Sequence, residues 1–343
     1  MSVLVAHLSD AHIKGNSDSL LSRTGNIASV IHSECSPSVK VIVLAFTGDV
    51  IDRGGVAGLA AADQFFSQLI DRVSDLTGRT VVLLLIPGNH DVVGPEDPSA
   101  RDAIIKTLTG DVAKSRPKPS IEKIVMSSLD DYFAFAGSVA GGVAITPTAA
   151  SPYYRCYELI VGESTFRFHL LNTAWMCTRE QKQGDLLYPI PEIQPPEATK
   201  PIDYEVALLH HPFAWFKQPE VMRQLRTAIE GVSDLVLTGH EHVGRSTRVG
   251  VHGGGSFEYR EGEVLQEGND SGFHLLAIDL DRKAQTVSTF KWETDDSNGA
   301  YVRVLGPIED IIGRNKTRGA AGYRLKTAFE NRLALQRGFP DGR

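Results

Sequence analysis

The chain has 343 residues, of which 42% are hydrophobic and 22% are charged. A chain of this length and composition is typical of a globular protein with a large core, built as one big domain or as one domain with an appendage. Its formal net charge of −7 argues against broad, non-specific attraction to nucleic acid, and no apolar stretch approaches the roughly 18 residues that a bilayer span requires.

Five short apolar runs are predicted to be buried strands, and each of them ends abruptly in polar residues. The runs are Val3 to Leu8, Val39 to Phe46, Thr80 to Ile86, Val206 to Leu209 and Leu235 to Leu237. Apolar residues at helical spacing predict helices over Ser19 to Ser33, Ala57 to Asp75 and Pro219 to Glu230. Strands that alternate with helices indicate an α/β fold, whose ligand sites usually lie at strand ends.

Other segments suggest an insertion and a second sheet. Residues from about 92 to 150 are rich in proline, loop-like and helix-like, and we expect an insertion or cap over the site. Tyr153 to Leu171 is predicted to form a hairpin around Gly162, and Phe273 to Asp279 is predicted to pair with Thr286 to Trp292. These hairpins favour a second β-sheet.

The C-terminal part is basic and helix-like. We expect residues 1–305 to form the main domain and residues 306–343 to form a basic helical extension. Three interpretations of the extension stay open: a helix packed on its own domain, a surface for a protein partner, or a nucleic-acid contact.

Residues suited to metal coordination stand at each of the five strand ends. Asp10 and His12 follow the first strand, and alternate side chains there share a face. Asp49 follows the second strand, and its two carboxylate oxygens are able to bridge two cations. Asn89 follows the third strand, and His90 beside it can exchange protons near neutral pH.

The two later strands end in imidazoles. His210 and His211 follow one of them, and His240 and His242 follow the other. Taken singly, each cluster is more typical of an ordinary turn or a capped strand end. Five clusters in the same context, almost all of metal-ligand type, favour a shared metal centre.

The motifs from Ser9 to His242 resemble the calcineurin-like metallophosphoesterase superfamily. Its pattern is Asp-x-His, Gly-Asp-x-x-Asp, Gly-Asn-His-Asp or Glu, a later His, and Gly-His-x-His, and every block is present here. The resemblance implies a four-layer α-β-β-α sandwich with two mixed sheets and a dinuclear metal site at the strand ends. The form of the last motif is typical of the phosphodiesterase-like branch.

The resemblance also implies roles for single residues. Two metal ions would be held by Asp10, His12 and His242 on one side and by Asn89, His210 and His240 on the other, with Asp49 bridging. His90 would be the catalytic proton donor. His210 is preferred to His211 because it stands directly at the strand end, but both stay open. Asp52 and Asp91 are expected to orient ligands from behind, with turn stabilisation as the alternative.

Arg53 follows Asp52 in a segment that resembles the Ser/Thr phosphatase branch, where the arginine contacts phosphate, and a guanidinium suits phosphate oxygens. The resemblance of this segment implies that Arg53 contacts the substrate phosphate, whereas Asp91 and the Gly-His-Glu-His motif depart from that branch.

The expected function is hydrolysis of phosphoesters, and of nucleotide phosphodiesters in particular, by a hydroxide activated between two metal ions. Mixed nitrogen and oxygen ligands suit Mn, Fe, Zn, Co or Ni. The alternatives are a DNA or RNA nuclease and a partner-binding module on the same scaffold. Four aromatic residues are candidates for stacking on a base, but packing in the core or at the rim is the favoured interpretation: Trp175, Tyr188, Trp215 and Phe216.

The cysteine pattern and the first residues bear on location. Cys35, Cys156 and Cys177 are far apart and odd in number, which argues against a disulfide framework or a thiolate zinc site. Met1 to His7 lacks the features of a signal peptide, and a cleavage there would damage the site at Asp10. We therefore expect a cytoplasmic protein with no membrane partner, a phosphoester substrate, and a protein partner as one option for the C-terminal helix.

Overall fold

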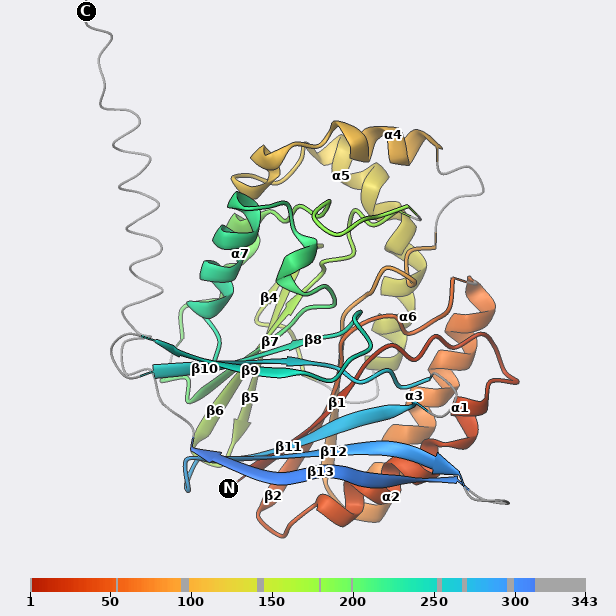
Figure 1. Ribbon diagram of the computed structural model, residues 1–343, viewed down its shortest axis with the longest axis vertical. Helices are drawn as coiled ribbons and strands as arrows, with labels where there is room; N and C mark the ends of the chain where they lie inside the picture. Colours follow the sequence, from red (N-terminus) through yellow and green to blue (C-terminus); the bar gives the residue numbers. More distant parts are fainter. Residues whose placement is uncertain are drawn as a thin grey trace, which may run out of the picture.

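The computed structural model describes residues 2–53, 55–93, 99–140, 145–178, 180–198, 200–251, 255–266, 270–294 and 299–311. In this part of the chain two mixed β-sheets pack together with helices on their outer sides, which confirms the expected α-β-β-α sandwich (Figure 1). One sheet has the strand order β13-β12-β11-β1-β2-β3, and the other has the order β4-β5-β6-β7-β8-β10-β9.

The six-stranded sheet combines three parallel strands with an antiparallel meander. The parallel strands are β1 (Ser2–Leu8), β2 (Val39–Phe46) and β3 (Thr80–Leu85). The meander consists of β11 (Gly272–Asp279), β12 (Ala284–Thr294) and β13 (Gly299–Ile311). The predicted strands and the second predicted hairpin are therefore confirmed, with shifts of a few residues at their ends.

Helices α1 (Ser19–Ser22), α2 (Thr24–Glu34) and α3 (Val56–Thr77) connect the parallel strands of this sheet. The single helix predicted over 19–33 is wrong in one respect, because it is interrupted at Arg23. The backbone N–H of Arg23 donates to the carbonyl of Leu20, three residues back, which closes the first helix in a tight turn.

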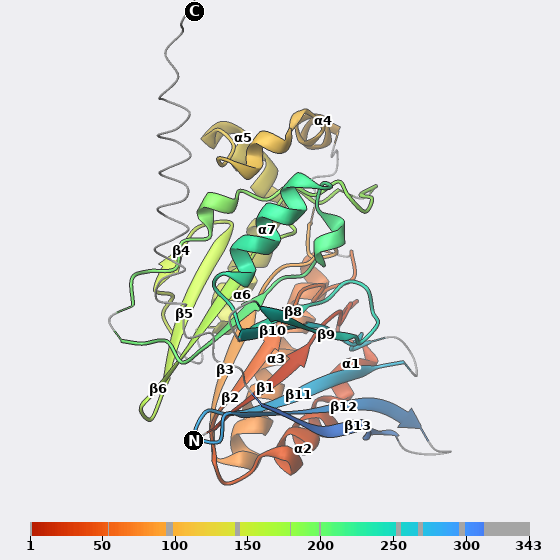
Figure 2. The same cartoon turned by 60° about the vertical axis from the view of Figure 1, so that its left-hand side comes forward.

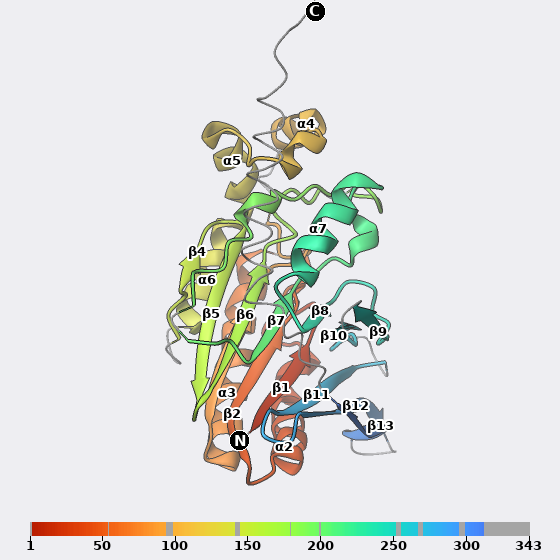
Figure 3. The same ribbon diagram turned by 90° about the vertical axis from the view of Figure 1, so that its left-hand side faces the viewer.

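The seven-stranded sheet is parallel at its centre and antiparallel at both edges. The central strands are β6 (Ser164–Leu171), β7 (Tyr204–Leu208), β8 (Leu235–Thr238) and β10 (Gly255–Glu261). The outer strands are β4 (Ala149–Ala150), β5 (Tyr154–Val161) and β9 (Ser246–Val251). The hairpin predicted around Gly162 is confirmed as β5 and β6, and helix α7 (Glu220–Glu230) joins β7 to β8 (Figure 3).

The core consists of two large apolar clusters, and side chains that alternate along a strand belong to different clusters. On β1, Val3 and Val5 belong to the apolar cluster between the two sheets, which also contains Val206 and Leu208 of β7. The alternate residues of β1 belong to a second cluster that contains the apolar faces of the helices. Strand β1 is thus buried on both faces, as is typical of a central strand in an α/β sheet.

The region between β3 and β4, predicted to be an insertion over the site, is largely helical in its described part. Helices α4 (Ser99–Thr107) and α5 (Pro119–Met126) project at one end of the molecule, whereas α6 (Asp130–Ala140) lies beside α3 (Figure 2). Phe135 of α6 and Phe66 of α3 contact each other, with ring centroids 6.2 Å apart. Buried Arg101 of α4 donates to the carbonyl of Cys177 at 2.8 Å, which ties the projecting helices to the loop after β6.

The boundary expected at residue 305 falls inside β13, which continues to Ile311. Gly306 has a φ of 94°, and the register with β12 shifts at this point, so the strand passes Gly306 and Pro307 by means of a bulge. The rest of the expected C-terminal extension, residues 312–343, lies outside the described residues. Among the described residues, no helix combines the length and apolar character that a membrane span requires.

Candidate metal centre

The loops after five parallel strands meet in one place. They follow β1, β2 and β3 of the six-stranded sheet and β7 and β8 of the seven-stranded sheet. Within each sheet the loops are hydrogen-bonded to one another: the N–H of Asp10 donates to the carbonyl of Gly48 at 3.0 Å, and that of Gly239 donates to the carbonyl of His210 at 2.9 Å. The loops of the two sheets also contact each other. His242 Nε2 lies 3.3 Å from Asp10 Oδ1, although the two residues are 232 positions apart in the sequence.

The backbone is strained at these loops. Among the described non-glycine residues, only Lys283 and five of the expected ligands have a positive φ. The five ligands are Asp10 at 54°, His12 at 45°, Asp49 at 56°, His240 at 75° and His242 at 57°. A left-handed conformation costs an L-residue about 1–2 kcal/mol, and strain of this kind gathers at functional sites.

Two glycines permit the loops to approach each other closely. Gly48 has a φ of 95°, and a Cβ atom there would lie 2.6 Å from His210 Nδ1. A Cβ atom on Gly88 would lie 2.1 Å from Asp49 Oδ1. Neither position has room for a side chain, so the glycines of the two motifs are required by the packing of the site itself.

Asp10, His12 and His242 form a first group of potential ligands. His242 Nε2 lies 3.3 Å from both Asp10 Oδ1 and His12 Nε2, and His12 Nε2 lies 4.0 Å from Asp10 Oδ1. Ligand atoms that surround one ion at about 2.1 Å stand about 3–3.5 Å apart. The three side chains therefore fit one metal ion.

Asn89, His210 and His240 form a second group. His210 Nε2 lies 3.0 Å from Asn89 Oδ1 and 3.1 Å from His240 Nδ1. On the other side of its ring, His210 Nδ1 donates to the carbonyl of Thr47 at 2.8 Å. In the neutral ring this hydrogen bond places the proton on Nδ1, so Nε2 is the nitrogen available to a metal ion, as in many metal sites.

Asp49 lies between the two groups. Its carboxylate is within reach of both Asp10 and His210, and its Oδ2 lies 3.4 Å from His210 Nε2. Burial alone would raise the pKa of Asp49, but His210, together with His90 and His12, outweighs burial and holds that pKa below its ordinary value. Burial would likewise lower the pKa of His210, but Asp49, together with Asp10 and the Thr47 carbonyl, raises it to about 9. A buried carboxylate that stays ionised is a suitable partner for cations.

The model of the calcineurin-like phosphoesterase family matches residues 3–244 of the chain. The chain belongs to this family. Members bind divalent metal ions, and the groups of aspartate and histidine described above stand within the matched region. The family resemblance drawn from the motifs is thus confirmed.

Solved structures with a similar fold include vacuolar protein sorting 29 from Cryptosporidium parvum, with 12% sequence identity and a TM-score of 0.33 over 90% of this chain and 98% of that chain. Vps29 from Chaetomium thermophilum has 8% identity and a TM-score of 0.34, over 91% and 99% of the two chains. Vps29 from Entamoeba histolytica, complexed with Zn²⁺, has 10% identity and a TM-score of 0.31, over 88% and 98%. Comparison with curated protein sequences gives no match.

In this member of the calcineurin-like phosphoesterase family, His90 stands at the exposed side of the centre. Its Nδ1 lies 3.4 Å from Asp52 Oδ1, and its ring contacts that of His12 with centroids 4.5 Å apart. The backbone N–H of His90 donates to Asp49 Oδ1 at 2.8 Å. His90 is therefore anchored through its backbone, while its ring, with 22% of the side chain exposed, borders the first ligand group.

Asp91 contacts the backbone of the loops after β2 and β3. It is fully buried, and its carboxylate accepts hydrogen bonds from the backbone N–H groups of Gly88 at 2.8 Å and Ile51 at 3.0 Å. Burial, with a further contribution from the Asp49 charge, raises the pKa of Asp91 to about 7. Of the two roles considered for Asp91, these contacts match the stabilisation of turns.

We expect Asp91→Ala to lower the free energy of unfolding by about 2–4 kcal/mol, because each buried N–H left without an acceptor costs about 1–3 kcal/mol. Urea denaturation followed by circular dichroism measures this loss. Asp63→Ala, at an exposed position of α3, is the matched control and should change stability little. Equal stability of the two variants would contradict the role of Asp91.

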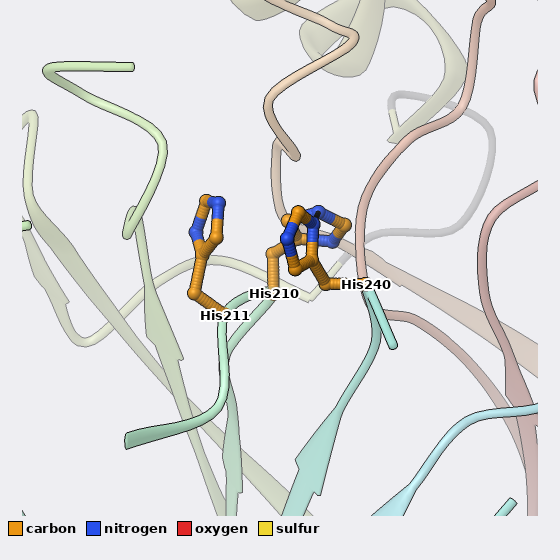
Figure 4. Close-up of side chains that lie close together, drawn as sticks. All are labelled: His210, His211 and His240. Carbon is orange, nitrogen blue, oxygen red and sulfur yellow. Dashed lines mark hydrogen bonds between the residues drawn. The ribbon is translucent and has the colours of Figure 1, made fainter. Parts of the chain in front are cut away.

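His210 and His211 point to different partners. Figure 4 shows the rings of His210 and His240 close together, with His211 to one side. His211 is buried, its Nδ1 lies 3.0 Å from the Thr173 hydroxyl, and its Nε2 lies 3.7 Å from the sulfur of Cys177. Because His210 alone contacts both Asn89 and Asp49, the geometry favours His210 as the ligand.

The remaining expected residues lie at the edge of the site or away from it. Arg53 is exposed, directly after Asp52. Trp175, Tyr188 and Phe216 are fully buried in the core, in agreement with the packing interpretation. Trp215 differs from these three, because it is half-buried and its ring stands edge-on to His240 at a centroid distance of 4.2 Å.

Three polar residues for which the motifs indicate no role lie behind the centre: His7, Ser9 and Thr47. All three are fully buried and hydrogen-bonded in a chain that ends on Asp10. The available signal was a polar residue at the very end of a buried strand, immediately before Asp10 and before Gly48.

Proposed function

We propose that this calcineurin-like phosphoesterase is a metal-dependent phosphodiesterase that acts on nucleotide phosphodiesters through two metal ions. The observation that carries the proposal is the pair of ligand groups joined at Asp49, with the His90–Asp52 pair beside them. Asp10, His12 and His242 would hold one ion, and Asn89, His210 and His240 would hold the other.

The donor set suits such ions. It combines imidazole nitrogens with carboxylate and amide oxygens, which favours Mn, Fe, Zn, Co or Ni over the softer metals that prefer thiolates. When bound, the ions supply Lewis acidity to the phosphoryl oxygens and make water a stronger nucleophile. The chain itself supplies the orientation of the ligands and the exchange of protons.

His90 is proposed to donate a proton to the departing oxygen of the substrate. With Nδ1 facing the Asp52 carboxylate, the ring presents Nε2 toward the substrate side as the proposed donor. Arg53, exposed beside Asp52, is proposed to contact the substrate phosphate, since its guanidinium can bind two oxygens at once.

The preference for diesters of nucleotides is supported by Trp215. Its half-buried ring borders His240, and its Nε1–H donates to Glu241 Oε1 at 2.6 Å, which fixes the orientation of the indole. A rigid aromatic surface beside a metal ligand is suited to stacking with a base. A cytoplasmic location, suggested by three unpaired cysteines, belongs to the same proposal.

The test is hydrolysis of bis-p-nitrophenyl phosphate beside p-nitrophenyl phosphate by metal-stripped protein reloaded with Mn²⁺. We expect metal-dependent turnover with a preference for the diester, and further turnover with a nucleotide diester. A preference for the monoester would refute the diesterase, and salt-sensitive cleavage of single-stranded DNA or RNA alone would favour a nuclease. Protein that binds two ions and cleaves none of these would favour the partner-binding module.

A further inference from the structure

An unbroken chain of side-chain hydrogen bonds leads from the interior of the protein to Asp10. His7 Nε2 lies 3.0 Å from the hydroxyl of Thr47, that hydroxyl donates to Ser9 Oγ at 2.8 Å, and Ser9 donates to Asp10 Oδ2 at 2.5 Å. All four residues are at most 1% exposed. Three of them belong to β1 or the loop after it, and Thr47 comes from the loop after β2, so the chain crosses between neighbouring strands.

The direction of each hydrogen bond follows from the number of available protons. Each hydroxyl has one proton to donate, and the carboxylate of Asp10 can only accept. Ser9 therefore donates to Asp10, and Thr47 donates to Ser9. The Thr47 oxygen is then left to accept from His7, so His7 carries its proton on Nε2. Burial, followed by the charge of Arg260, lowers the pKa of His7 to about 3, which leaves this ring neutral with a single N–H.

The two oxygens of Asp10 are consequently used for different purposes. Oδ2 accepts from Ser9, and the backbone N–H of His240 is shared by both oxygens, at 3.1 Å from Oδ2 and 3.3 Å from Oδ1. Oδ1 faces His242 Nε2 at 3.3 Å, within the first ligand group. With Oδ2 held by protein donors, the carboxylate cannot rotate freely, and Oδ1 stays directed toward the place of the ion.

The seven-stranded sheet packs directly against the end of this chain of hydrogen bonds. A Cβ atom on Gly239, at the end of β8, would lie 2.2 Å from Ser9 Oγ and 2.9 Å from Asp10 Oδ2. Only a glycine at this position leaves Ser9 and Asp10 in their present orientation. The backbone of Thr47 has a separate function, because its carbonyl accepts from His210 Nδ1 at 2.8 Å. One residue thus supports both ligand groups, through its hydroxyl on one side and its carbonyl on the other.

We infer that His7, Thr47 and Ser9 act as a positioning relay, which holds Asp10 Oδ1 toward the first metal ion and so sets the affinity of the Asp10 group for that ion. The inference rests on the proposed function, in which Asp10 is a metal ligand. Residues that orient ligands from behind typically change metal affinity by about 10- to 100-fold when they are replaced.

Thr47→Val tests the relay, since valine keeps the shape of threonine and the backbone carbonyl but lacks the hydroxyl. Titration calorimetry of metal-stripped protein with Mn²⁺ measures the affinity of each site, and His242→Ala and His240→Ala identify which site is which. We expect Thr47→Val to weaken the Asp10 site by about 10- to 100-fold and to leave the His210 site unchanged. Ser9→Ala, which removes only the last hydrogen bond, should weaken the same site.

Thr238→Val is the matched control. Thr238 is buried and precedes Gly239 and His240 as Thr47 precedes Gly48 and Asp49, but its hydroxyl has no hydrogen-bond partner among the described residues. This variant should bind both ions as the unmodified protein does. Unchanged affinity of the Asp10 site in Thr47→Val and Ser9→Ala, or an equal loss in Thr238→Val, would overturn the relay alone. Unmodified protein that binds no Mn²⁺ would overturn the proposed function, and the relay with it.

Discussion

Asp49→Ala is expected to abolish the binding of both metal ions and to lower kcat/KM for a phosphodiester by roughly 10³- to 10⁵-fold. The reason is that the Asp49 carboxylate is within reach of both Asp10 and His210, so in the proposed centre its loss would remove a ligand from each ion. Metal ions contribute several kcal/mol to the stabilisation of the transition state, and every 1.36 kcal/mol is a tenfold change in rate. Metal content by mass spectrometry and steady-state kinetics measure the two effects.

A second variant separates the loss of the ligand from damage to the fold. Asp49 has a left-handed backbone and accepts the N–H of His90, and asparagine tolerates the same conformation and keeps an acceptor oxygen. Asp49→Asn should therefore remain folded and still bind metal poorly, because the bridging charge is gone. Asp63→Asn on the exposed face of α3 is the control. Two full equivalents of metal in Asp49→Asn would show that Asp49 is not the bridge.

His90→Ala is expected to keep both metal ions and to lose about 10²- to 10⁴-fold in turnover, the range that general acid catalysis typically contributes. The backbone N–H of His90, which donates to Asp49, remains in this variant, so the bridging carboxylate keeps its hydrogen bond. Only the ring beside Asp52 is lost. In His90→Ala the metal content should therefore stay unchanged while kcat falls, whereas in Asp49→Ala both should fall.

The choice of leaving group sharpens this experiment. A p-nitrophenolate leaves without protonation, whereas an alkoxide such as the ribose oxygen of a nucleotide needs a proton. The loss caused by His90→Ala should hence be larger for a nucleotide diester than for bis-p-nitrophenyl phosphate. Equal losses for the two substrates would argue that His90 positions the substrate rather than protonating it.

The sequence predicted the residues that meet at the centre because each stands directly after a buried strand, and the carboxyl ends of neighbouring parallel strands meet at one edge. Asp10 and Asn89 illustrate this, since both follow parallel strands of the six-stranded sheet. The contact of Asn89 with His210 also requires the packing of the two sheets, which strand position alone does not give. The spacing of apolar residues was less informative about where a helix or strand is interrupted. The break at Arg23 and the bulge at Gly306 depend on hydrogen bonds that no hydrophobic period records.

The support behind the ligands could not be predicted in the same way. Whether the hydroxyl of Thr47 contacts Ser9, 38 residues away, depends on the register between β1 and β2, which only the folded sheet defines. The same is true of Trp215 and Phe216, which are adjacent in sequence but differ in burial at the point where a short 3₁₀ turn, Phe213–Trp215, ends. The composition and the hydrophobic periodicity of the sequence do not distinguish two adjacent aromatic residues of this kind.

The ligands of each proposed ion come from both sheets: Asp10 and His12 face His242, and Asn89 faces His210 and His240. Ions bound there would cross-link the two halves of the sandwich. A ligand that binds only the folded state raises stability by RT ln(1 + [L]/Kd), or about 2.7 kcal/mol when it is in hundredfold excess over its Kd. The metal supply of the cell would then govern the lifetime of the protein against unfolding and proteolysis, as well as the fraction of molecules that can turn over substrate.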